Sequence, residues 1–185
     1  ETGITNMEHD IQQIVYTADE IAERVKELAA QISRDYAGKP LLLVGVLRGA
    51  VVFLSDLMRQ ITIPCQIDFL SASSYGFSTV SSGCVTIKTN LSEDPAGKDL
   101  LIVEDILDTG ITLSHIQPML EEKGANSVKL VALLDKPSRR KIPISLDYCG
   151  FVTSDRFLVG YGLDYAEKYR NLPYIGILKP KVYQK

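Results

Sequence analysis

The sequence predicts an α/β protein with an open, mostly parallel sheet flanked by helices. Short runs dominated by apolar residues recur at positions 41–46, 100–103 and 128–134. Runs of this kind are typical of strands that are buried on both faces of a parallel sheet. Segments with helical spacing of apolar residues lie between them, and alternating strands and helices indicate parallel βαβ units. Ligands of such sheets bind beyond the carboxyl ends of the strands.

The first helix is predicted from a capping signal. Thr17 and Glu20 have the spacing of a capping box, in which each side chain accepts a hydrogen bond from the backbone of the other residue. Apolar residues then recur at helical spacing, which predicts a helix to about Ala37. Gly38 and Pro40 end it.

The remaining elements follow from the same patterns. Helices are expected at residues 51–59 and 112–124, and Pro118 should bend the second helix or leave one of its carbonyls unpaired. The stretch 73–83 is rich in serine and glycine, carries no charge, and links two predicted strands. Strands are expected at residues 41–46, 66–72, 84–90, 99–103 and 128–134, with shorter extended pieces at 146–153, 158–161 and 174–178.

Composition excludes several classes of protein. The 185 residues fit a single domain, and the net charge of −3 gives no support for binding nucleic acid. No apolar run approaches the roughly 18 residues that span a membrane, and no signal peptide is recognisable, so we expect a cytoplasmic protein. Three cysteines without C-x-x-C spacing and two isolated histidines argue against a disulfide framework, a zinc site or a Ser-His-Asp triad.

Three acidic residues gather after the run 100–103. Glu104 and Asp105 follow it directly, and Asp108 begins the sequence Asp-Thr-Gly-Ile-Thr. Paired carboxylates at a strand end suit hydroxyl groups or Mg²⁺, and the following amides and hydroxyls at a helix start suit a phosphate. A solvated helix cap would explain Asp108 but explains Glu104 and Asp105 less well.

Two other predicted strand ends carry basic residues. Arg48 and Gly49 follow the first apolar run and would suit a pyrophosphate, because Gly49 permits close backbone approach. Lys136 follows the run 128–134 and could donate to a carbonyl of a ligand. Taken alone, the first segment is better explained as an ordinary strand-to-helix turn, and the second as a surface lysine in a charged stretch.

The segment VEDILDTG, followed by Ile-Thr, resembles the phosphoribosyl-pyrophosphate signature of the type I phosphoribosyltransferases. Over residues 45–177 the motifs LRGA, SSYG, LLDKPSRR and DRFLVGYGLD come in the family's order and resemble the members that act on hypoxanthine and guanine. The resemblance implies the type I phosphoribosyltransferase fold as one domain over residues 1–185. It divides into a core at about 15–155 and a small hood formed by the N-terminal segment and about 156–185.

The resemblance also implies a reaction. Family members transfer the 5-phosphoribosyl group of phosphoribosyl pyrophosphate to a 6-oxopurine in purine salvage, giving IMP or GMP and pyrophosphate. Asp108 would act on purine N7 as general acid and base. Glu104 and Asp105 would hold the ribose hydroxyls, directly or through Mg²⁺. The 5′-phosphate would lie against Asp108, Thr109, Gly110, Ile111 and Thr112.

Other roles carry over in the same way. Pyrophosphate would contact Arg170 and the loop of Leu47, Arg48 and Gly49, which contains a cis peptide in the family. The purine would meet Lys136 at its 6-oxo group, the ring of Phe157, the backbone of Leu158, and Asp164, which would also bind a second Mg²⁺. Ser74 and Tyr75 would belong to a lid over the site. The family usually forms homodimers or homotetramers.

A protein that reuses this fold as a regulator sensing phosphoribosyl pyrophosphate is the alternative. It is disfavoured because the chain has neither room for an added DNA-binding segment nor a basic composition. A preference for xanthine or orotate fits Lys136, Phe157 and Leu158 less well.

Overall fold

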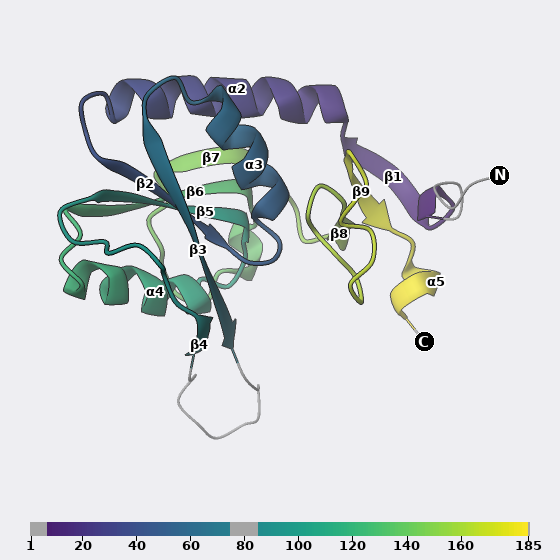
Figure 1. The fold of residues 1–185 in the computed structure, drawn as a ribbon. Helices are drawn as coiled ribbons and strands as arrows, with labels where there is room; N and C mark the ends of the chain where they lie inside the picture. Colours follow the sequence, from purple (N-terminus) through teal and green to yellow (C-terminus); the bar gives the residue numbers. More distant parts are fainter. Residues whose placement is uncertain (1–6, 75–84, 185) are drawn as a thin grey trace.

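The computed structural model describes residues 7–74 and 85–184, which form a six-stranded sheet between helices and a second, smaller sheet (Figure 1). The large sheet has the order β4-β3-β2-β5-β6-β7; β3 and β4 are antiparallel and all other neighbours are parallel. The predicted open, mostly parallel α/β sheet is confirmed. Its strands are β2 (Leu41–Val46), β3 (Cys65–Ser74), β4 (Val85–Thr89), β5 (Asp99–Leu107), β6 (Ser127–Asp135) and β7 (Tyr148–Val152).

Helices cover both faces of this sheet. Helices α2 (Ala18–Asp35) and α3 (Val51–Gln60) lie on one face, and α4 (Ile111–Glu122) lies on the other (Figure 1). The residues of β2 alternate between the two cores that result, with Leu41 and Leu43 on the side of α2 and α3. Leu42 and Val44 pack on the side of α4. Burial on both faces explains why this strand is apolar at every position.

The capping box of α2 is confirmed in both directions. The amide of Glu20 donates to Thr17 Oγ1 at 3.2 Å, and the amide of Thr17 donates to Glu20 Oε2 at 2.8 Å. The helix ends at Asp35, slightly before the predicted end at Ala37. Its apolar stripe is buried against the sheet and consists of Ile21, Val25, Leu28, Ala29 and Ile32.

The smaller sheet joins the two ends of the chain. Strand β9 (Ile175–Leu178) pairs antiparallel with β1 (Ile11–Tyr16) and with β8 (Leu158–Val159). Both termini lie on this side of the molecule, together with the short helix α5 (Pro180–Tyr183) (Figure 1). A single turn of 3₁₀ helix, η1 (Pro137–Arg139), follows β6. No helix of the described residues is long and apolar enough to cross a membrane.

The short helices η1 and α5 were not predicted, and two strands differ clearly from the sequence prediction. Strand β5 was expected to end at Val103 but continues to Leu107, because Glu104, Ile106 and Leu107 still pair with β6. Strand β1 was not predicted, because its pairing with β9 is nonlocal and its polar residues hide the strand pattern. The predicted strand-to-strand link at residues 73–83 is consistent with the antiparallel pairing of β3 and β4, although residues 75–84 lie outside the described chain.

Candidate active site

The sheet topology brings the three predicted strand ends together. Strands β2, β5 and β6 are neighbours and parallel, so the segments that follow them meet at one edge of the sheet. The amide of Lys136 donates to the carbonyl of Leu107 at 3.0 Å, which ties the end of β6 to the end of β5. Arg48, Asp108 and Lys136, which are far apart in the sequence, are therefore carried by adjacent segments.

The acidic pair lies at the end of β5, with Glu104 buried and Asp105 partly buried. Only 8% of the surface of Glu104 is exposed, and burial, followed by the neighbouring Asp105, raises the pKa of its carboxyl well above the usual value. Burial also raises the pKa of Asp105 to about 6, against the lowering effects of the Ile106 amide, Glu104 and Arg170. Ile106 N donates to Asp105 Oδ1 at 2.7 Å. Two neighbouring acids whose pKa values are both raised favour a ligand that brings positive charge or hydroxyl donors.

The loop after β2 passes directly over Asp105. Its peptide bond between Leu47 and Arg48 is cis, as the resemblance implies. A Cβ atom on Gly49 would lie 1.8 Å from Asp105 Oδ2, so a side chain at this position cannot coexist with the observed carboxylate. Glycine is required here by close approach, which the sequence alone left as one of two explanations.

We expect Gly49→Ala to displace either this loop or Asp105, and to lower kcat/KM for the phosphoribosyl pyrophosphate that the resemblance implies by about tenfold or more. Initial-rate kinetics with that substrate varied would measure the loss. Gly97→Ala controls for a general loss of stability: an added Cβ there has no neighbour within 4 Å, but the φ of 73° makes the substitution strained, so the variant should lose stability and keep its kcat/KM. Equal kinetics for Gly49→Ala and the unaltered enzyme would contradict the prediction.

The segment between β5 and α4 forms a small polar cavity of about 90 Å³. Its lining includes Glu104, Asp108, Thr109, Gly110 and Thr112. The cavity lies at the N-terminus of α4, where backbone amides and the helix dipole favour an anion. Gly110 has a φ of 82°, and a Cβ on it would lie 2.6 Å from the carbonyl oxygen of Ile142. The cavity therefore has the size and donors for a phosphate group.

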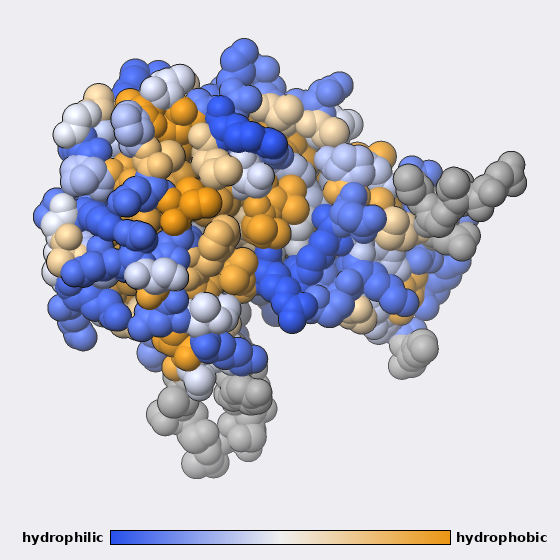
Figure 2. Space-filling view, in the orientation of Figure 1, coloured by the Kyte–Doolittle hydropathy of each residue, from blue (hydrophilic) through white to orange (hydrophobic). Residues whose placement is uncertain are grey.

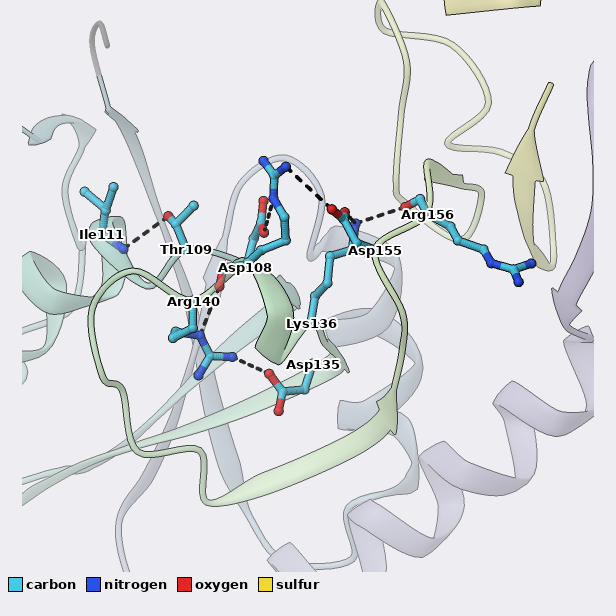
Figure 3. A network of polar contacts seen from close by, with 9 residues as sticks. Asp108, Thr109, Ile111, Asp135, Lys136, Arg140, Asp155 and Arg156 are labelled. Atoms are coloured by element: carbon cyan, nitrogen blue, oxygen red, sulfur yellow. Dashed lines mark hydrogen bonds and ion pairs between the residues drawn. The ribbon is translucent and has the colours of Figure 1, made fainter. Parts of the chain in front are cut away.

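The segment after β6 supports this cavity from behind. The carbonyl of Thr109 accepts hydrogen bonds from the amides of Lys141 at 2.9 Å and Ile142 at 3.1 Å. Arg140 donates to the carbonyl of Asp108 at 3.0 Å and pairs with Asp135 (Figure 3). The conformation of the phosphate segment thus depends on a segment that lies 32 positions further along the chain.

Arg139, which the sequence analysis did not single out, lies between Asp108, the predicted general acid and base, and the residues predicted to bind the purine. Arg139 Nε lies 3.4 Å from Asp108 Oδ1, and its Nη1 lies 3.8 Å from Asp155 Oδ2. Figure 3 shows this network, with Asp155 also facing Lys136. The only signal in the sequence was the basic stretch DKPSRRK, which by itself is typical of a surface.

Lys136 is buried rather than a surface lysine. Its exposed fraction is 9%, and its Nζ donates to the carbonyl of Arg156 at 2.9 Å and lies 3.6 Å from Asp155 Oδ1. A buried ammonium fixed by these two acceptors still has a third donor for a ligand.

The aromatic residue predicted to stack on a base is backed by other rings. Phe157 is 37% exposed, and its ring stacks on Tyr183 of α5 at a centroid distance of 4.5 Å. Tyr165 meets the Phe157 ring edge-on at 5.5 Å. Leu158 follows as the first residue of β8, where its backbone pairs with Ile177. The neighbouring rings fix the orientation of Phe157.

The segment 161–170 carries the last group of predicted residues. Arg170 donates to the carbonyl of Gly162 at 2.7 Å, and its Nη2 lies 3.2 Å from Asp164 Oδ1. Gly162 packs so closely on the Gly49 carbonyl that an added Cβ would lie 2.3 Å from that oxygen. The segment therefore sits against the loop after β2, which brings Arg170 and Arg48 to the same part of the site.

The carboxylates present can hold Mg²⁺ only with help from a ligand. Among the described residues, no three histidine, cysteine or acidic side chains lie close enough to hold a metal ion by themselves. Asp164 is therefore not grouped with Glu104 and Asp105 as a ready-made site. Mg²⁺ is commonly bound by one or two carboxylates together with water and phosphate oxygens, so the acidic pair fits this ion. Of the predicted lid, Ser74 ends β3 and Tyr75 lies outside the described residues.

Comparison with known proteins agrees with this geometry. Residues 12–166 match the family described as "Phosphoribosyl transferase domain". The chain is 50% identical over 178 residues to the hypoxanthine-guanine phosphoribosyltransferase of Bacillus subtilis, covering 96% of this chain and 99% of that protein. It is also 50% identical over 181 residues to the bifunctional protein TilS/HprT of Listeria innocua, but spans only 28% of that longer protein's length.

Solved structures give the same result. The structure is similar to a hypoxanthine phosphoribosyltransferase from Staphylococcus aureus, with a TM-score of 0.95, 47% identity, and full coverage of both chains. It is also similar to a point mutant of the hypoxanthine phosphoribosyltransferase of Trypanosoma cruzi, solved as a ternary complex with substrates, with a TM-score of 0.89 and 39% identity. That match covers 95% of this chain and 99% of the other.

Proposed function

The chain belongs to the type I phosphoribosyltransferase family, among its hypoxanthine-guanine phosphoribosyltransferases, and we propose that it salvages purines with the residues of this site. The proposed reaction transfers the 5-phosphoribosyl group of phosphoribosyl pyrophosphate to N9 of hypoxanthine or guanine. IMP or GMP and pyrophosphate are the products.

The observation that carries this proposal is the acidic pair of buried Glu104 and partly buried Asp105 beside the phosphate-sized cavity of residues 108–112. The acidic pair suits the ribose hydroxyls, and the cavity suits the 5′-phosphate. Gly49, which has no side chain, lies directly against the Asp105 carboxylate. A ribose 5-phosphate fits both groups of contacts at once.

The purine would bind on the other side of Asp108. Lys136 Nζ donates to the 6-oxo group, Phe157 stacks on the base, and the Leu158 backbone meets the purine edge. Asp108 lies between the phosphate segment and this base site, and its carboxylate takes up or returns the proton at N7. Substrate positioning and the fixed charges near the reacting groups then provide the catalysis, without a protein nucleophile.

Pyrophosphate leaves on the side of Arg48 and Arg170. Their guanidinium groups, with the amides of the loop 47–49, neutralise the departing charge. We propose that Glu104, Asp105 and Asp164 help to hold Mg²⁺, which supplies further positive charge to the pyrophosphate when it is bound.

The test is a comparison of initial rates with hypoxanthine, guanine, xanthine and adenine, each with phosphoribosyl pyrophosphate and Mg²⁺. We expect kcat/KM for hypoxanthine and guanine to exceed that for adenine by about 100-fold or more. A chelator should abolish turnover and added Mg²⁺ should restore it. Binding of phosphoribosyl pyrophosphate without formation of a nucleotide from any base would instead indicate a regulator.

We also propose a homodimer or homotetramer in the cytoplasm. Hydrophobic residues gather on the visible face over α3 and β3, where Val51 and Ile67 are among the exposed large apolar residues (Figure 2). Exposed apolar faces often mark contacts between proteins, and this face therefore supports the proposal of an oligomer. The described cysteines Cys65 and Cys149 are free thiols, which supports a reducing compartment. Sedimentation equilibrium tests the subunit number.

A further inference from the structure

Glu167, a residue outside the predicted site, lies between the two arginines assigned to pyrophosphate. Its Oε2 lies 2.8 Å from Arg48 Nη1, and its Oε1 lies 3.3 Å from Arg170 Nη2. Arg48 belongs to the loop after β2, whereas Arg170 follows β8 in the chain. The Glu167 carboxylate therefore bridges the two segments whose arginines are proposed to bind pyrophosphate.

The backbone around Glu167 has an unusual conformation. Ala166, Glu167 and Tyr169 have φ values of 50°, 63° and 76°, in the left-handed region that non-glycine residues rarely adopt. The amide of Glu167 donates to Asp164 Oδ2 at 2.9 Å, which fixes the turn to another predicted ligand residue. Strained backbone held in this way is a frequent feature of functional sites.

The chemistry of the bridge resembles that of the ligand. A carboxylate and a phosphate both accept paired hydrogen bonds from guanidinium groups. The pair with Arg48 is well exposed, with 71% of the arginine side chain and 60% of the glutamate side chain accessible. Exposed ion pairs are weak, so a more highly charged anion with more oxygens can displace the glutamate.

We propose that Glu167 is a positioning residue that competes with pyrophosphate for Arg48 and Arg170. This inference rests on the proposed function, because it assumes that the two arginines bind the leaving group. By holding the arginines itself, Glu167 weakens the binding of pyrophosphate and speeds its release.

The experiment replaces Glu167 with glutamine and measures the binding of inorganic pyrophosphate by titration calorimetry at a fixed Mg²⁺ concentration. We expect Glu167→Gln to bind pyrophosphate about two- to fivefold more tightly, the range expected when a weak, exposed, competing ion pair is removed. Product inhibition by pyrophosphate should strengthen by a similar factor. The KM for hypoxanthine should not change. A general loosening of the fold would instead alter both the affinity for pyrophosphate and the KM for hypoxanthine.

Two further variants control the experiment. Glu27→Gln removes a comparable surface pair, between Arg24 and Glu27 of α2 at 2.6 Å, and should leave pyrophosphate binding unchanged. Glu167→Gly suits the positive φ and also removes the carboxylate, so it should tighten binding even if the glutamine variant folds poorly. Unchanged or weaker binding of pyrophosphate in both Glu167 variants would overturn the proposal. A wild-type protein that binds pyrophosphate but transfers no phosphoribosyl group would overturn the proposed function instead.

Discussion

Asp108→Asn is expected to lower kcat by about 10²–10⁴-fold, because asparagine cannot exchange a proton with purine N7. The asparagine side chain has nearly the same size and keeps an oxygen that can face Arg139, which lies 3.4 Å from the present carboxylate. The phosphate cavity should therefore keep its shape. Binding of phosphoribosyl pyrophosphate should change only a few-fold, so the loss should appear in kcat rather than in the Kd for this substrate.

Steady-state kinetics and titration calorimetry with phosphoribosyl pyrophosphate separate these two effects. Asp94→Asn is the matched control, because Asp94 lies in the turn before β5, at the opposite end of that strand, and its carboxylate accepts a local hydrogen bond from the amide of Ala96 at 3.0 Å. Full activity in Asp108→Asn would rule out the acid–base role. Loss of substrate binding equal to the loss of kcat/KM would assign Asp108 to binding alone.

Lys136→Ala is expected to raise KM for hypoxanthine and guanine by about 10- to 100-fold, the value of a hydrogen bond from a charged donor. Discrimination against adenine should fall by a similar factor. The reason is that Lys136 offers only donors, which pair with a 6-oxo group but leave a 6-amino group without a partner. In the variant, neither base meets a donor at this position.

The measurement is kcat/KM for hypoxanthine and for adenine in the same preparation. Lys129→Ala is the matched control, since Lys129 lies in the same strand β6 but is exposed at the other end. Thermal unfolding of both variants checks the fold, because the alanine at position 136 leaves the Arg156 carbonyl without its donor. Unaltered selectivity in Lys136→Ala would contradict the assignment of this lysine to the 6-oxo group.

Local sequence signals predicted most of the large sheet correctly. The strands β2 and β6 and the capping box of α2 depend on patterns within a few residues of one another, and such patterns are visible in a single chain. Strand β1 was missed because its stability comes from pairing with β9, at the other end of the chain. The continuation of β5 through its acidic residues was also missed, because an acid in a strand looks like a strand end unless the partner strand is known.

The site divides in the same way. The segment from Glu104 to Thr112 and the residues Arg48, Lys136 and Phe157 could be named from motifs and from the resemblance that those motifs carry. The residues Arg139, Asp155 and Glu167 could not, because their roles are contacts with side chains brought close by the fold. Glu167 reaches Arg48 across 119 positions of sequence, and no local pattern records that distance.

The sequence by itself determined the family, the reaction class and the residues expected to face the sugar phosphate. The tertiary structure determined the surroundings of several of these residues, and those surroundings explain why each position needs its residue type. It placed Gly49 against the Asp105 carboxylate, enclosed Lys136, backed Phe157 with Tyr183 and set Glu167 between two arginines. The physical reason is that motif residues interact with the ligand through their own chemistry, whereas close approach, burial and charge competition depend on which distant segments the sheet brings together.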